Sequence, residues 1–140
     1  MNYLVFLDAS AGELEKILSG VKSMLVKEFD PAAPAGQPVK PGDSLYFLRS
    51  KDDCTLQVKA SVLRVRYFTN NLAESQALIL KEMQPRLQLT EEQYSYWSAK
   101  GQALLVEFGS AHKIGVIRIA PEKVMDRSDW IPFEDFSLIT

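Results

Sequence analysis

Cysteine and histidine are almost absent from this sequence, which has one of each among its 140 residues: Cys54 and His112. A single cysteine cannot form an intramolecular disulfide, which is typical of a reducing cytosol, and this pair cannot supply the ligands of a usual zinc site. No run of 18 apolar residues is present, so the sequence predicts no membrane-spanning helix. The apolar run Leu4–Leu7 has no basic region before it and does not indicate a signal peptide. We therefore expect a cytoplasmic protein that uses no metal or other cofactor.

An excess of charge of one sign is also lacking. The sequence has 16 Lys and Arg against 18 Asp and Glu, a formal net charge of -2, unlike the strongly basic domains that bind duplexes in general. Neither a glycine-rich phosphate loop nor a nucleophile elbow occurs. Residues 20–66 nevertheless carry eight basic and five acidic side chains. This segment predicts either a local anion site or charges scattered over solvated strand faces.

The apolar pattern predicts a single α+β domain over residues 1–140, with 121–140 as a C-terminal extension. Strands are expected over 2–7, 22–29, 44–50, 54–68, 103–108 and 113–120, and helices over 10–20, 72–83 and 90–97. Within 54–68 the apolar alternation changes parity between Val62 and Leu63, which predicts a bulge in a curled sheet or small barrel. Gly109–Ala111 is expected to be a turn between the last two strands.

Local signals predict where the helices begin and end. Ser10 with Glu13, and Thr90 with Gln93, have the spacing of a capping box, in which two side chains satisfy backbone N–H groups reciprocally. Pro85 is expected to stop the second helix, because proline has no backbone N–H. A core-facing stripe is expected on the first helix at Leu14, Ile17, Leu18 and Val21.

Three aromatic residues near the end of the chain are too large to stay in solvent. Trp130, Phe133 and Phe136 can each bury roughly 150–250 Å². We expect them to dock on the barrel, or across the contact of a homodimer.

Two motifs resemble the ASCH domains of the PUA-like superfamily. Gly20–Lys22 followed by Val26–Lys27 is similar to the Gly-x-Lys-x-x-x-x-Arg stretch of that family, and Lys40–Asp43 contains its Pro-Gly-Asp turn before a strand. Glu107–Phe108 is similar to the end of its closing strand. The resemblance covers residues 4–108. It implies a β-barrel with helices flanking a cleft, and binding of RNA or of a modified nucleoside.

The leading hypothesis is an RNA- or nucleotide-binding module with a basic cleft near Lys22. The residues expected to bind the ligand are Lys22, Ser23, Lys27, Tyr46, Arg49 and Arg64. Aromatic faces can stack on a base, and arginine can hold a phosphate. Lys27 replaces the arginine of the family motif, which keeps the charge but loses the bidentate fork.

Two alternatives belong to other functional classes. Some members of the family are amidohydrolases that act on acetylated cytidine with a Lys, a Thr three residues later and a Glu. Lys22 matches that Lys and would act as the base, whereas Leu25 stands at the Thr position, and Glu74 and Glu82 are the nearest candidates for the Glu. The second alternative is a protein-interaction domain without a small ligand, in which the acidic tail and its aromatic residues meet a partner.

Overall fold

The computed structural model describes residues 1–28, 39–50, 52–69, 73–100, 102–124 and 130–140. The strands there are β1 (Asn2–Phe6), β2 (Met24–Glu28), β3 (Ser44–Leu48), β4 (Thr55–Thr69), β5 (Gln102–Arg118) and β6 (Trp130–Phe133). The α-helices are α1 (Glu13–Leu18), α2 (Ala73–Leu87) and α3 (Glu91–Ser98), and the short 3-10 helices are η1 (Pro121–Lys123) and η2 (Phe136–Leu138). The predicted α+β class is confirmed. Among the described residues, no helix combines the length and the apolar character needed to cross a membrane.

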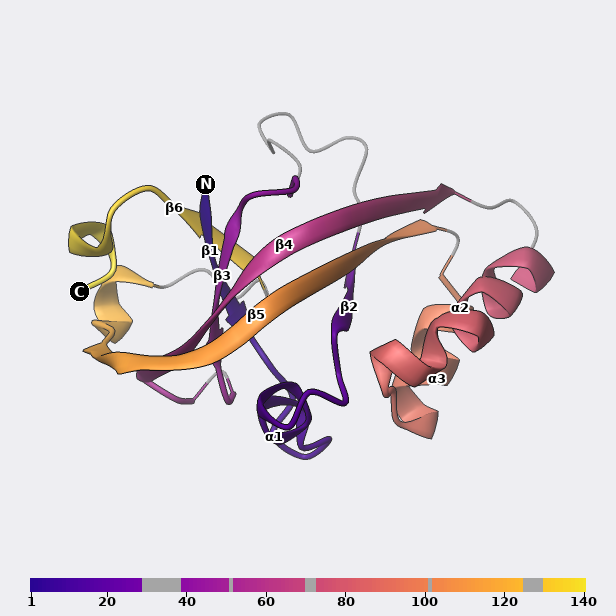
Figure 1. The fold of residues 1–140 in the computed structure, drawn as a ribbon, viewed down its shortest axis with the longest axis horizontal. Helices are drawn as coiled ribbons and strands as arrows, with labels where there is room; N and C mark the ends of the chain where they lie inside the picture. Colours follow the sequence, from indigo (N-terminus) through magenta and orange to yellow (C-terminus); the bar gives the residue numbers. More distant parts are fainter. Residues whose placement is uncertain (29–38, 51, 70–72, 101, 125–129) are drawn as a thin grey trace.

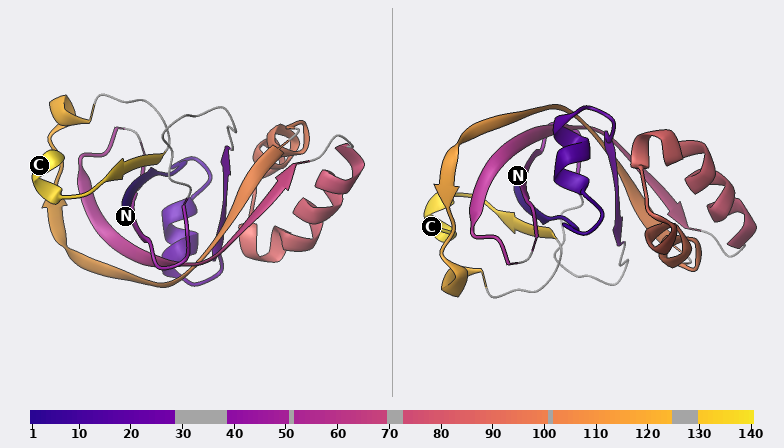
Figure 2. Two further views of the ribbon diagram at one scale, coloured as in Figure 1. Left: turned by 90° about the horizontal axis from the view of Figure 1, so that it is seen from above. Right: turned by 90° about the horizontal axis from the view of Figure 1, so that it is seen from below.

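The six strands form one sheet in the order β2-β5-β4-β3-β1-β6. β1 and β3 pair in parallel, and the other neighbouring strands pair in antiparallel fashion. The sheet curls into a half-barrel with α1 on its concave side (Figures 1 and 2). The curl brings its outermost strands close together, since Nζ of Lys27 on β2 lies 5.8 Å from the ring centroid of Trp130 on β6. The predicted curled sheet flanked by helices is therefore confirmed.

The bulge predicted within residues 54–68 is confirmed in β4. Pairing between β4 and β5 shifts register at several points, one of them between Val62 and Arg64. The predicted turn at Gly109–Ala111 was wrong, because β5 continues through it. From Lys59 to Ser61 the partner in β5 changes from His112 to Gly109, so β5 carries an extra residue there, and Ser110 adopts φ 57°. Such bulges increase the local twist and let two long strands wrap around the core.

The capping box predicted for the first helix was wrong. The N-cap of α1 is Gly12 at φ 64°, while the Ser10 hydroxyl donates to Oδ1 of Asp8 at 2.6 Å. Glu13 accepts a hydrogen bond on Oε1 from the Asp8 backbone N–H at 2.8 Å. The loop before α1 is thus organised around Asp8, and the second oxygen of Glu13 is available for another contact.

The region between α2 and α3 follows the sequence signals more closely. The Thr90–Gln93 capping box is confirmed, with the Gln93 N–H donating to Thr90 Oγ1 at 3.2 Å and the Thr90 N–H donating to Gln93 Oε1 at 3.0 Å. Pro85 does not stop α2, which ends two residues later at Leu87. Residues 88–90 therefore form a short α2–α3 connector.

Buried residues form three apolar clusters. The largest fills the concave side of the sheet and includes Leu14 and Ile17 of α1. Leu18 and Val21, which were expected in this core, are 36% and 51% exposed, because the six-residue helix turns only a narrow stripe toward the sheet and ends at Leu18. A second cluster, with Met24, Leu87 and Leu89, lies where α2 and α3 cover the convex face.

The third cluster is formed with the end of the chain. β6 pairs with β1, and Phe133 is buried. The rings of Phe133 and Phe136 lie 5.7 and 5.1 Å from that of Tyr46. The expected docking of these aromatic residues on the barrel is confirmed within one chain.

Candidate ligand site around Lys22

Lys22 lies between α1 and the start of β2. Gly20 adopts φ 85° just after the helix, a conformation that glycine reaches without a Cβ clash. The chain then turns back, and the Lys22 N–H donates to the carbonyl of Lys16 at 3.0 Å. This turn directs the Lys22 side chain into the molecule, where the residue is 1% exposed.

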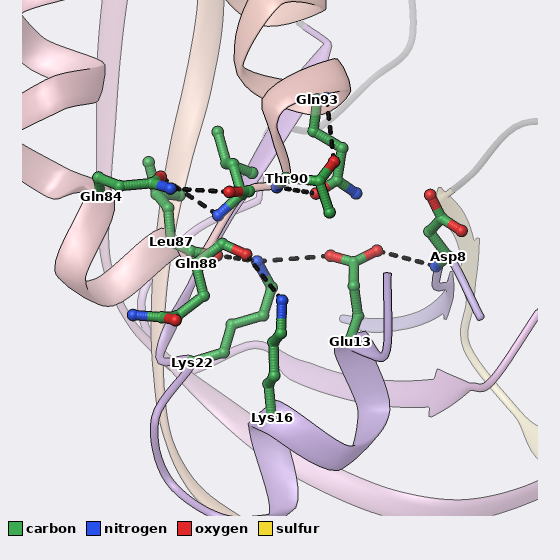
Figure 3. A network of polar contacts seen from close by, with 10 residues as sticks. Asp8, Glu13, Lys16, Lys22, Gln84, Leu87, Gln88, Thr90 and Gln93 are labelled. Atoms are coloured by element: carbon green, nitrogen blue, oxygen red, sulfur yellow. Dashed lines mark hydrogen bonds and ion pairs between the residues drawn. The ribbon is translucent and has the colours of Figure 1, made fainter. Parts of the chain in front are cut away.

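Two groups contact the buried ammonium (Figure 3). Nζ of Lys22 donates a hydrogen bond to the backbone carbonyl of Leu87 and forms an ion pair with Oε2 of Glu13 at 3.4 Å. The other oxygen of Glu13 is held by the Asp8 N–H. One lysine thus joins α1, the loop before α1 and the C-terminal end of α2.

Burial is the main influence on the charge of this lysine. It lowers the pKa of Lys22 below the 10.5 of a free lysine side chain, whereas the Glu13 carboxylate acts in the opposite direction and Lys16 lowers the pKa further. Loss of hydration disfavours the charged form of a lysine, which is why its pKa falls.

Lys16 reaches the next carbonyl of the same segment. Its Nζ donates to the carbonyl of Gln88 at 3.3 Å, and Gln88 takes φ 52°. The Gln84 side chain holds the connector through the backbone of Leu89, donating to its carbonyl at 2.7 Å and accepting from its N–H at 3.2 Å. We call Glu13, Lys16 and Lys22, with the carbonyls of Leu87 and Gln88, the Lys22 junction.

A cluster of charged side chains lies next to this junction on the surface. Ser23 donates its backbone N–H to the carbonyl of Arg86 at 3.0 Å. Nη1 of Arg86 is 3.2 Å from Oε1 of Glu107, and Nε of Arg64 is 3.6 Å from Oε2. We call Arg64, Arg86 and Glu107 the Arg–Glu–Arg cluster. Of the predicted site residues, Lys22, Ser23 and Arg64 are linked through these contacts.

The other three predicted residues lie elsewhere. Lys27 lies beside Trp130, and burial lowers its pKa against the opposing effect of Glu28. Tyr46 is buried beneath the aromatic residues of the tail. Arg49 pairs with Glu15 on α1. The structure therefore does not bring these three side chains to the Lys22 junction.

The carboxylate next to Lys22 was not identified from the sequence. Glu82 is exposed, and the side chain of Glu74 lies outside the described residues. Glu13 fills this place, but its capping-box spacing indicated a different, local role. Leu25, at the position of the family threonine, is 5% exposed and belongs to the apolar core.

Comparison with solved structures shows which fold this is. The crystal structure of ASCH from Zymomonas mobilis matches with a TM-score of 0.67 and 11% identity, over 95% of this chain and 87% of that chain. A single-residue variant of that protein matches with a TM-score of 0.69 and 11% identity, over 96% and 91% of the two chains. The chain has the fold of an ASCH domain.

A third solved structure matches with a lower TM-score. The N-terminal domain of Staphylothermus marinus McrB has a TM-score of 0.56 at 11% identity, over 99% of this chain and 92% of that chain. No family model and no curated protein matches the sequence. The fold agrees with the resemblance to ASCH domains, and in it the Lys22 junction lies where α1 meets the α2–α3 connector.

Proposed function

We propose that this ASCH-fold domain binds single-stranded RNA or a nucleotide-like ligand through the cationic groups of the Lys22 junction. The observation that carries the proposal is the burial of the Lys22 ammonium between one carboxylate and one carbonyl. A buried ion pair costs desolvation energy and is often no better for stability than apolar residues of the same size. A charged group kept in such a place is a candidate functional group.

The present partners of the two lysines indicate the chemistry of a ligand. Lys22 and Lys16 donate to the carbonyl oxygens of two consecutive residues. A nucleobase carbonyl or a phosphoryl oxygen is the same kind of acceptor, and hydrogen bonds from ammonium to phosphate are strong. The net charge of -2 fits a confined site with weak non-specific binding.

The resemblance to ASCH domains supports this proposal, because it implies binding of RNA or of a modified nucleoside. A cytoplasmic location, where such ligands occur, belongs to the same proposal. Self-association through the C-terminal aromatic residues remains a prediction that size-exclusion chromatography can test.

The experiment is a fluorescence anisotropy titration with a labelled single-stranded RNA decamer, together with a panel of unlabelled nucleotides as competitors. Lys22→Met keeps the side-chain length without the charge and should weaken binding by about tenfold, the effect of losing one charge-assisted hydrogen bond. Lys16→Ala should weaken it by a similar factor without changing the melting temperature. Lys113→Ala, at an exposed position of β5, is the matched control and should bind like the wild type.

Two results would contradict the proposal. One is equal affinity of the wild type and both junction variants, with folding confirmed by circular dichroism. The other is a wild type that binds neither RNA nor any nucleotide of the panel, which would favour the protein-interaction hypothesis.

The second candidate function is amide hydrolysis. The observation in its favour is the ion pair between Glu13 and Lys22, in which a carboxylate contacts an amine whose pKa is lowered. A lowered pKa makes the neutral amine, the form that accepts a proton as a general base, more accessible than in a free lysine. If this function is correct, the wild type releases acetate from acetylated cytidine and leaves cytidine, while Lys22→Met and Glu13→Gln do not. No acetate from the wild type would exclude it for this substrate.

A further inference from the structure

Glu107 holds two arginines from separate elements on the convex face of the sheet. It lies on β5 opposite Met24 of β2 and Arg64 of β4, and Arg86 reaches it from the last turn of α2. The side chains of Arg64 and Arg86 are 69% and 53% exposed, whereas that of Glu107 is 19% exposed. The carboxylate is therefore mostly covered, while both guanidinium groups face solvent.

We propose that Arg64 and Arg86 form a contact site for the phosphate backbone of single-stranded RNA, and that Glu107 occupies this site as an internal competitor. This inference rests on the proposed function and adds a second contact site for the RNA, outside the Lys22 junction. It assigns Glu107 the role of limiting the affinity for RNA.

The geometry of the cluster fits a phosphate group. The two arginines contact different oxygens of one carboxylate, Arg64 at Oε2 and Arg86 at Oε1. A phosphodiester also presents two non-bridging oxygens, which share one negative charge and can each contact a guanidinium group. Both guanidinium groups are exposed to solvent, where a single ion pair contributes little to stability, so a phosphate can compete with the Glu107 carboxylate for them.

The cluster is continuous with the Lys22 junction. Arg86 directly precedes Leu87, whose carbonyl accepts from Lys22, and the Arg86 carbonyl accepts from the N–H of Ser23. Arg66 lies two residues beyond Arg64 on the same strand and is exposed. A strand of RNA with one nucleotide at the junction would therefore find positive charge along β4 for its next phosphates.

The test compares Arg64→Ala, Arg86→Ala and Glu107→Gln with the wild type, using the RNA decamer and a mononucleotide as separate probes. Each arginine variant should bind the decamer several-fold more weakly. The negative slope of log affinity against log salt concentration should become shallower by about 0.7, the contribution of one phosphate contact in a single strand. Glu107→Gln should bind the decamer several-fold more tightly. None of the three changes should alter binding of the mononucleotide.

The pair Arg49–Glu15 provides matched controls, because it is an exposed Arg–Glu pair away from the cluster. Arg49→Ala and Glu15→Gln should leave both affinities unchanged. Weaker or unchanged decamer binding by Glu107→Gln would overturn the inference, as would arginine variants with wild-type affinity and salt slope. If the wild type binds neither probe, the proposed function itself fails, whereas decamer binding that is lost in Lys22→Met but unaffected by the arginine variants rejects this inference alone.

Discussion

At the scale of single residues, the central feature is an ion pair buried between elements. Lys22 is 1% exposed, and its Nζ lies 3.4 Å from Oε2 of Glu13. Removing one partner of such a pair leaves the other charge buried without compensation, which is more costly than removing both.

This arrangement predicts strong coupling between the two positions. Glu13→Gln should destabilise the protein by about 3 kcal/mol, because it leaves the Lys22 ammonium without its carboxylate. The double variant Glu13→Gln with Lys22→Met should recover most of this loss. Urea unfolding of the wild type, both single variants and the double variant measures the coupling, and additive effects of the two changes would contradict it.

The lowered pKa of Lys22 predicts a pH dependence of stability. Because the pKa is lower in the folded state than the 10.5 of the unfolded state, the unfolded chain binds more protons in the interval between these values. The free energy of unfolding should therefore gain a contribution as pH rises through this interval toward 10.5, and lose it as pH falls. Urea titrations in alkaline buffers should show this contribution in the wild type and not in Lys22→Met.

Only part of this site could be predicted from the sequence. Lys22 is recognisable from its motif and its position after Gly20, but nothing local shows that α2 ends against it. Glu13 follows Ser10 at the spacing of a capping box, so the sequence alone indicated a helix cap for it. Arg86 and Glu107 are 21 residues apart, and their contact depends on how α2 crosses the sheet.

At the scale of elements, local signals were reliable where no other group competed for the same side chain. The Thr90–Gln93 capping box formed as predicted, whereas the Ser10–Glu13 box did not, because Asp8 and Lys22 contact those residues instead. The change in the alternation of apolar residues along β4 correctly indicated a bulge. Gly109 suggested a turn, but β5 continues through this position with a bulge.

Helix capping therefore gives a paired prediction. Thr90→Ala should lower the free energy of unfolding by about 1 kcal/mol, since it removes a side-chain cap. Ser10→Ala should cost less than about 0.5 kcal/mol, as is usual for exposed positions outside such features. Thermal or urea denaturation of the two variants measures both changes in the free energy of unfolding. Equal losses of stability in Thr90→Ala and Ser10→Ala would mean that Ser10 also caps a helix.

At the scale of the whole molecule, the half-barrel is completed by the end of the chain. β6 adds to the free side of β1, and its aromatic residues cover Tyr46 on the convex face. Trp130 lies between the outermost strands, near Lys27 and 6.1 Å from the ring of Tyr3. Residues 130–140 thus contribute to the packing of the sheet.

Truncating a buried aromatic residue of this segment should be costly. Phe133 is 4% exposed, so Phe133→Ala should lower the free energy of unfolding by about 3–5 kcal/mol. Leu138, in the same segment, is 58% exposed, and Leu138→Ala should cost less than about 0.5 kcal/mol. A loss below about 1 kcal/mol for Phe133→Ala would contradict the docking of the tail.

The most direct test of the central claim is an NMR titration of the ¹⁵N-labelled chain with unlabelled single-stranded RNA. Binding at the Lys22 junction predicts that backbone amide shifts concentrate in residues 13–24 and 84–90, with little change in residues 130–140. The same titration of Lys22→Met should require about tenfold more RNA for the same shifts. Shifts confined to the C-terminal residues, or no shifts at saturating RNA, would contradict the account.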